Sequence, residues 1–142
     1  VSIQWQRRVP GVPENAKGMA IARAYRPLGT EKIKEGDLVQ ITLSPTFSTR
    51  DTYGCYEIRD RLPANLAPVL NWSMPEGSWY PTKQMDGSLS FVSCGSYSDV
   101  IRYTARVTVA GTYTAPAPIV QHLEQPSLSA VGSTNAFSAE RK

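Results

Sequence analysis

The chain has 142 residues, of which 41% are hydrophobic and 19% are charged, and its formal net charge is +3. This length and composition fit one globular domain over residues 1–142, and the scattered arginines disfavour a nucleic-acid-binding protein. No apolar run approaches the roughly 20 residues that a membrane-spanning helix needs, so we expect no membrane insertion by this domain.

Alternation of apolar and polar residues, with a period of two, predicts strands along most of the chain. The clearest example is VIRYTARVTV at residues 100–109, where every second residue from Ile101 to Val109 would face inward. Eleven prolines and ten glycines separate such stretches, as is typical between short strands. Strands are predicted near residues 2–8, 19–26, 37–44, 54–61, 88–94, 100–109 and 112–120, with a weaker one near residues 134–140. Seven or eight strands without a convincing helix predict an all-β fold, a single antiparallel β-sandwich.

One further segment lacks this alternation. Residues 68–87 form the longest irregular stretch, and its aromatic residues Trp72, Trp79 and Tyr80 could either cover the core or form an exposed binding patch. Asn71 begins an N-glycosylation pattern, which matters only in a glycosylating host. The last five residues, SAERK, are expected to be loose. Because the chain starts at Val1 rather than at a methionine, we expect it to derive from a larger protein.

Asp60, at the end of the strand predicted over residues 54–61, could be a catalytic acid or a structural residue. A catalytic carboxylate usually needs a partner, and Glu57 points to the opposite face because three residues is an odd step in a strand. We therefore expect Asp60 to accept backbone N–H bonds at the strand end, before the turn that contains Pro63 and Asn65. No catalytic, metal-binding or cofactor-binding arrangement is identified, and we do not expect an enzyme.

The two cysteines, Cys55 and Cys94, both fall on the polar faces of predicted strands. With His122 as the only histidine, a four-ligand zinc site is disfavoured. If their strands are neighbours, the cysteines can form a disulfide that closes a loop of about 40 residues. The alternative is two free thiols in a reducing compartment, and the exposure of both residues favours the disulfide.

The sequence HLEQ, from His122 to Gln125, is similar to the Cys-x-Glu-Gln motif of internal thioesters. A thioester requires a thiol that condenses with the glutamine side chain, and an imidazole cannot supply it. We therefore reject thioester chemistry at this position.

Three stretches match motifs of one family in order and spacing. KEGDLVQITL looks like a domain-opening strand, and GCYEIRDRLPANLAPV resembles a strand followed by Asp-x-Leu-Pro-Ala-Gly-Leu. IRYTARVTVAGTYTAPAPIVQ resembles the more specific Tyr-x-x-Arg-Val-x-x-x-Gly-Thr-Tyr/Phe-x-Ala-Pro pattern. Together they resemble the C-terminal macroglobulin-like domain of bacterial alpha-macroglobulins, over about residues 18–130, which we expect to form the core. The signature residues of this resemblance are Asp60, Pro63, Arg106 and Gly111.

The resemblance implies a non-catalytic sandwich, macroglobulin-like or fibronectin-III-like, at the end of an extracellular or cell-envelope protein that traps proteases. Its partners would be neighbouring domains of the same protein, among them a helical thioester domain, and the trapped proteases. Many Gram-negative members carry Met-Tyr-x-Pro after the Ala-Pro strand, and that tyrosine is thought to shield the thioester. Here Glu124 replaces the tyrosine, and the expected interface is His122, Leu123, Glu124 and Gln125. The alternative is a structural or adhesion repeat of a bacterial cell-surface protein, because such repeats also carry Asp-x-Leu-Pro-x-Gly-Leu.

Overall fold

The computed structural model describes residues 15–16, 18–29, 31–47, 54–69, 82–95 and 100–142. These ranges contain eleven β-strands and no helix, and every pair of neighbouring strands is antiparallel. The all-β prediction is confirmed. Some predictions concern residues outside the described ranges. These are the strand at residues 2–8, the glycosylation pattern at Asn71, and the role of the aromatic residues Trp72, Trp79 and Tyr80.

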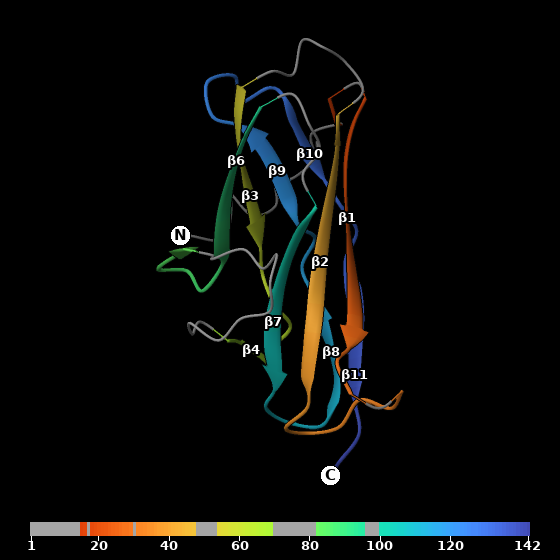
Figure 1. Cartoon of the computed structure of the whole chain (residues 1–142). Helices are drawn as coiled ribbons and strands as arrows, with labels where there is room; N and C mark the ends of the chain where they lie inside the picture. The colour runs from red at the N-terminus through yellow and green to blue at the C-terminus, as the bar shows by residue number, and fades with distance from the viewer. Residues whose placement is uncertain (1–14, 17, 30, 48–53, 70–81, 96–99) are drawn as a thin grey trace, which may run out of the picture.

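The strands form two facing sheets and a two-stranded ribbon near the C-terminus (Figure 1). One sheet has the order β1-β2-β7-β4, the other has the order β10-β9-β3-β6-β5, and β11 pairs with β8. In chain order the strands are β1 (Met19–Pro27), β2 (Leu38–Phe47), β3 (Gly54–Asp60), β4 (Leu66–Pro68), β5 (Thr82–Lys83), β6 (Leu89–Gly95), β7 (Ile101–Val107), β8 (Gly111–Ala115), β9 (Ile119–His122), β10 (Ser129–Val131) and β11 (Asn135–Ala139).

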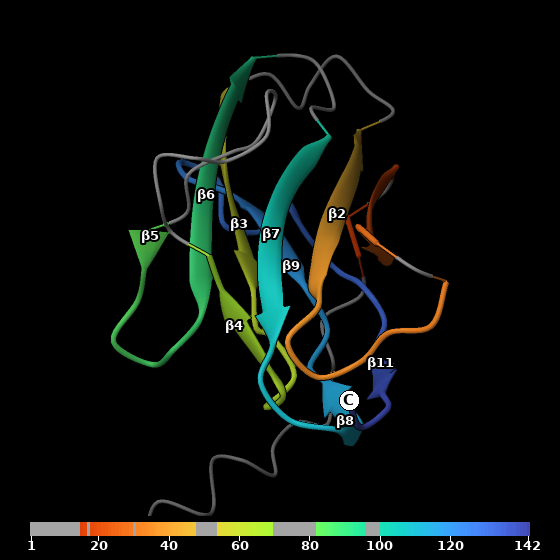
Figure 2. The same ribbon diagram turned by 60° about the horizontal axis from the view of Figure 1, so that its bottom comes forward.

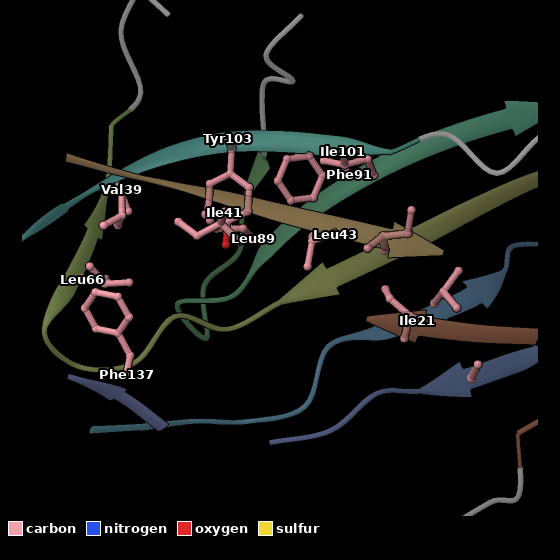
Figure 3. Close-up of a cluster of buried hydrophobic side chains, with 14 of the residues drawn as sticks. Ile21, Val39, Ile41, Leu43, Leu66, Leu89, Phe91, Ile101, Tyr103 and Phe137 are labelled. Atoms are coloured by element: carbon pink, nitrogen blue, oxygen red, sulfur yellow. The ribbon is translucent and has the colours of Figure 1, made fainter. Parts of the chain in front are cut away.

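The core lies between the two sheets, where alternate residues of each strand point inward (Figure 3). From the four-stranded sheet, β2 and β7 contribute Val39, Ile41, Ile101 and Tyr103, all at most 1% exposed. From the five-stranded sheet, β3 and β6 contribute Tyr56, Ile58, Leu89 and Phe91, at most 2% exposed. The period-two pattern of the sequence is therefore the inside–outside alternation of the sandwich.

The structure differs from the predicted strands in four places. The strand expected at residues 112–120 is divided into β8 and β9, because Pro116 and Pro118 lack the N–H groups that a strand needs. Strand β7 ends at Val107, so Val109 lies outside the strand and is 43% exposed, not inward. Strands β4, β5 and β10 were not predicted, because two or three residues are too short to show alternation.

The fourth difference concerns the end of the chain. Phe137 and Ala139 on β11 are 3% and 8% exposed and belong to the core, which therefore extends beyond residue 130. Glu140 forms a parallel bridge with Lys34. The expectation of a loose tail from residue 138 onward is thus wrong for residues 138–140, because β8 offers β11 a partner that local sequence does not reveal.

Candidate functional site

Asp60 lies in a buried network of charged and hydroxyl groups. Its Oδ1 accepts a hydrogen bond from Arg23 at 2.5 Å, and its Oδ2 accepts one from the hydroxyl of Tyr103. Asp60 is 1% exposed. Among the described residues its donors are side chains and not the backbone N–H groups that we expected, because the inward face of β3 points it at β1 and β7.

Arg23 extends this network to the connection between β8 and β9. It donates to the backbone oxygens of Ala115 and Pro116 at 3.3 and 2.9 Å, and to Oδ1 of Asn135 at 3.2 Å. Arg23 is not among the site residues that we predicted from the sequence. The sequence does contain a signal for it, because Arg23 occupies an inward position of β1, between Ile21 and Tyr25. An arginine on an apolar face implies a buried acidic partner.

The network perturbs the titration of two tyrosines. Burial raises the pKa of Tyr103 well above 10, and the nearby Asp60 carboxylate, which accepts its hydrogen bond, adds to this effect. Burial also raises the pKa of Tyr25 to about 12, an increase that Arg23 opposes. Both carboxylate oxygens of Asp60 are engaged by side chains, so the arrangement is suited to holding strands together.

A shallow pocket of about 270 Å³ lies beside this network, with Arg59, Arg61 and Ile119 among its lining residues. Arg61 pairs with Asp86 at 2.9 Å. Hydrogen bonds from the Ser88 side chain and backbone, with a smaller contribution from Arg61, lower the pKa of Asp86 to about 2. The charges of Arg61 and Asp86 thus neutralise each other.

The predicted interface forms the turn between β9 and β10, which Figure 1 shows at the end of the sandwich opposite the C-terminus. Leu123 is 51% exposed, and Glu124 and Gln125 are exposed too. His122 differs from them, because it is 2% exposed and lies under the turn. We therefore remove His122 from the expected contact surface and define the docking turn as residues 123–126.

His122 instead holds the docking turn from inside. Its Nδ1 accepts hydrogen bonds from the backbone N–H groups of Glu124 and Gln125, at 3.1 and 3.0 Å. The ring also packs edge-on against Tyr56 with centroids 4.9 Å apart. Because Nδ1 accepts both bonds, it carries no proton in this arrangement.

The docking turn is connected directly to the disulfide. Cys55 and Cys94 are opposite partners on β3 and β6 and are joined, so the disulfide prediction is confirmed. The backbone N–H of Leu123 donates to the oxygen of Cys55 at 2.9 Å. Gly54 lies so close to His122 that a Cβ there would be 2.5 Å from Nε2. The fold thus brings the disulfide, Gly54 and the docking turn together.

The signature residues Pro63, Arg106 and Gly111 lie at the end of the sandwich opposite the docking turn. Asn65, which stands where the family pattern has glycine, lies among them in the turn after β3. Asn65 is fully buried and does not need a positive φ, so its replacement of glycine is accommodated. Its Nδ2 donates to the oxygen of Gly111, and its own backbone oxygen accepts from Thr108. The Arg106 side chain donates to the backbone oxygen of Gly36 at 2.7 Å. The backbone oxygen of Pro63 accepts a hydrogen bond from the N–H of Leu66 at 3.0 Å, which closes the turn.

The described ranges contain neither a metal-binding group nor a membrane-spanning helix. In that part of the chain, no three His, Cys, Asp or Glu side chains come together in a group that could hold a metal ion. No helix there is long and apolar enough to cross a membrane.

Comparison with known proteins identifies the fold. No protein-family model and no curated protein matches the sequence. Among solved structures, trypsin-activated alpha-2-macroglobulin from Escherichia coli matches with a TM-score of 0.67 and 19% identity, over 92% of this chain and 11% of that chain. Alpha-2-macroglobulin from Salmonella, reacted with methylamine, matches with a TM-score of 0.65 and 20% identity, over 92% of this chain and 10% of that chain.

A third match concerns the C-terminal part of an alpha-2-macroglobulin. A native E. coli alpha-2-macroglobulin fragment, which spans domain MG7 to the C-terminus, matches with a TM-score of 0.62 and 21% identity. The match covers 92% of this chain and 25% of that one. The chain therefore has the fold of a domain in bacterial alpha-2-macroglobulins and spans a tenth to a quarter of the length of these structures.

Proposed function

We propose that this chain is the non-catalytic, C-terminal macroglobulin-like domain of a bacterial protein that traps proteases, and that it docks onto a neighbouring domain of that protein through the docking turn. The observation that carries this proposal is the construction of the turn. It exposes an apolar residue, Leu123, on a backbone that is held from below by a buried side chain, His122.

Pre-ordering makes the docking turn a good contact surface, since a partner would not have to order it on binding. Besides the two bonds to His122, Leu128 donates to the oxygen of Gln125 at 2.8 Å, and the Gln121 side chain donates to the oxygen of Pro126 at 3.2 Å. Leu123 would enter an apolar depression on the partner, and Glu124 would accept hydrogen bonds at its rim.

The position of Glu124 changes what kind of contact is expected. In the family that the sequence resembles, a tyrosine at this position would shield a thioester from water. A glutamate cannot provide the same apolar cover, so we propose that packing falls to Leu123 and that the neighbouring domain offers polar donors to Glu124.

The structural matches support the proposed context. The E. coli protein in one of them had been activated by trypsin, so a protease acts on that protein. The disulfide between Cys55 and Cys94 favours an oxidising compartment, and we propose that the domain lies outside the cytoplasm, in the cell envelope or the medium. A non-enzymatic role agrees with Asp60, whose two oxygens are bound by Arg23 and Tyr103.

The test compares amide hydrogen exchange of residues 121–128 in this chain alone and in the longest natural product of its gene. We expect much slower exchange of these amides in the longer protein, because the docking turn would be covered there. Leu123→Glu should restore fast exchange, since it places a charge in the contact. The matched control is Val109→Glu, which changes an exposed apolar residue (43%) in the turn between β7 and β8, at the other end of the sandwich.

Three results would overturn the proposal. These are equal exchange in both forms, equal effects of the two glutamate variants, or a gene whose product is a tandem array of this domain. The last result would support the structural or adhesion repeat instead.

A further inference from the structure

The outer face of the four-stranded sheet differs in charge from the rest of the molecule. The four strands β1, β2, β7 and β4 contain no aspartate or glutamate at all. They do contain four arginines, of which Arg23 points into the core and Arg26, Arg102 and Arg106 are exposed. Arg26, Arg102 and Arg106 alternate with the inward residues of β1 and β7, so they lie on the side away from the five-stranded sheet. Figure 2 shows β2 and β7 on the near side of the sandwich.

The register places Arg26 and Arg102 close to each other on this face. Arg26 is opposite Gln40, which is opposite Thr104, and Arg102 lies two residues before Thr104 on β7. With strands about 4.8 Å apart and a rise of about 3.4 Å per residue, the two Cα atoms are about 12 Å apart. Thr104 itself is buried and adds no accessible surface.

Besides Gln40, which lies opposite Arg26, the neighbours of the two arginines on this face include small side chains. Ala22 and Ala24 on β1 are exposed, and Thr42 and Ser44 on β2 are half-buried. Arg26 and Arg102 are themselves exposed, so a partner can reach both side chains.

Neither the Arg26 nor the Arg102 side chain forms a hydrogen bond or ion pair with any described residue. The five-stranded sheet is different, because Glu57 binds Arg59 at 2.5 Å and Asp86 binds Arg61 at 2.9 Å. Among the described residues, Arg59 and Arg61 thus have acidic partners, whereas Arg26 and Arg102 have none.

We propose that the outer face of the four-stranded sheet, centred on Arg26 and Arg102, binds an acidic protein surface with at least two carboxylates at a matching spacing. Guanidinium groups bind carboxylates through two parallel hydrogen bonds, and this geometry makes arginine the suitable residue for such pairs. The face exposes no aromatic side chain from its strands that could stack on nucleotide bases, which favours a protein partner over nucleic acid. This inference concerns the sheet opposite the docking turn and does not rest on the proposed function.

The test uses the full chain and a fluorescent poly-glutamate peptide, with binding followed by anisotropy at low and at physiological salt. We expect salt-dependent binding that the double variant Arg26→Glu/Arg102→Glu weakens at least about tenfold. The control Arg59→Glu/Lys83→Glu makes the same change of net charge on the five-stranded sheet and should change the affinity less than about threefold. Arg26→Gln/Arg102→Gln repeats the test without introducing repulsion, and thermal unfolding verifies that each variant is folded.

The outcomes divide clearly. Loss of binding in both arginine variants of the four-stranded sheet, with retention in the control, supports the proposal. Equal loss in the control, or no binding of the peptide by the wild-type chain at low salt, overturns it. Tighter binding of a DNA duplex or of phosphatidylserine vesicles than of the peptide, with the same dependence on Arg26 and Arg102, also overturns it in favour of a different class of partner.

Discussion

Arg23 and Asp60 form an ion pair that joins the two sheets of the sandwich through its core. Arg23 comes from β1 of the four-stranded sheet, Asp60 ends β3 of the five-stranded sheet, and both side chains are fully buried. The same guanidinium binds the backbone oxygens of Ala115 and Pro116, where the chain passes from β8 to β9. One side chain thus ties together three segments that are distant in the sequence.

Replacement of Arg23 by methionine should lower the free energy of unfolding by about 3–5 kcal/mol, because it leaves a buried carboxylate without its cation. Urea unfolding of the variant and of the wild-type chain measures this loss. Asp60→Asn should cost less, about 1–3 kcal/mol, because the amide retains an acceptor and Arg23 keeps its backbone partners. An Arg23→Met variant as stable as Asp60→Asn would contradict the role assigned to the pair.

Tyr103 and Tyr25 should make the fold sensitive to alkaline pH. Both have a raised pKa in the folded state, so below pH 10 they are protonated in the folded and unfolded chains alike. Above pH 10 the unfolded chain loses these protons while the folded chain keeps them, and stability therefore falls as pH rises. For Tyr25 this window extends to about pH 12.

Tyrosinate absorbance and circular dichroism, recorded together during an alkaline titration, check this expectation. At least two of the seven tyrosines should ionise only as the fold is lost. Tyr25→Phe is the gentler control, because the Tyr25 hydroxyl has no hydrogen-bond partner among the described residues. The Tyr25→Phe variant should lose less free energy of unfolding as the pH rises above 10, because one of the two tyrosines with a raised pKa is gone. Ionisation of all seven tyrosines before any loss of structure would disprove the prediction.

Removal of the disulfide by Cys55→Ser/Cys94→Ser should lower the free energy of unfolding by about 3–4 kcal/mol, since the bond closes a long loop in the unfolded chain. Intact mass after alkylation under denaturing conditions establishes the bond first: no label before reduction and two labels after it. Unfolding of the wild-type chain with and without reductant then gives the energetic contribution. Equal stability in both conditions, with reduction verified by mass, would rule out a stabilising role.

Gly54→Ala should destabilise the domain for two reasons. Gly54 has a φ of 142°, which residues with a side chain rarely adopt, and its new Cβ would lie 2.5 Å from Nε2 of His122. Gly29→Ala is the matched control, because nothing lies within 4 Å of its Cβ and its φ is not positive. Thermal unfolding should show a clear loss for the first variant and little change for the second. The opposite order would mean that the close approach to His122 is not present in solution.

His122→Ala should release the docking turn, because the amides of Glu124 and Gln125 lose their acceptor. His122→Asn should release it less, since the asparagine Oδ1 can occupy about the same position as Nδ1 and accept a bond. Amide hydrogen exchange of residues 124 and 125 distinguishes the two variants. Equal exchange in both would show that the ring stabilises the turn by packing alone.

Part of this architecture follows from local sequence. The alternation around Ile101 and Tyr103 predicts which residues face the core, because a strand repeats every two residues whatever its partner is. The polar environment of Cys55 and Cys94 likewise favoured the disulfide that the structure contains. The sequence alone thus determined the all-β class and most strand positions, and it favoured the disulfide, which the pairing of β3 with β6 then decided.

The partners of single side chains were decided only by the tertiary structure. Asp60 and Arg23 are 37 residues apart, and His122 is buried because β9 pairs with β3 and places the ring beside Gly54. That the Arg26 and Arg102 side chains have no acidic partner among the described residues also depends on the order of the strands, which puts them in a sheet whose strands contain no acidic residue. Strand order and register are set by long-range pairing and by the packing of two sheets, and neither leaves a periodic signal within one strand.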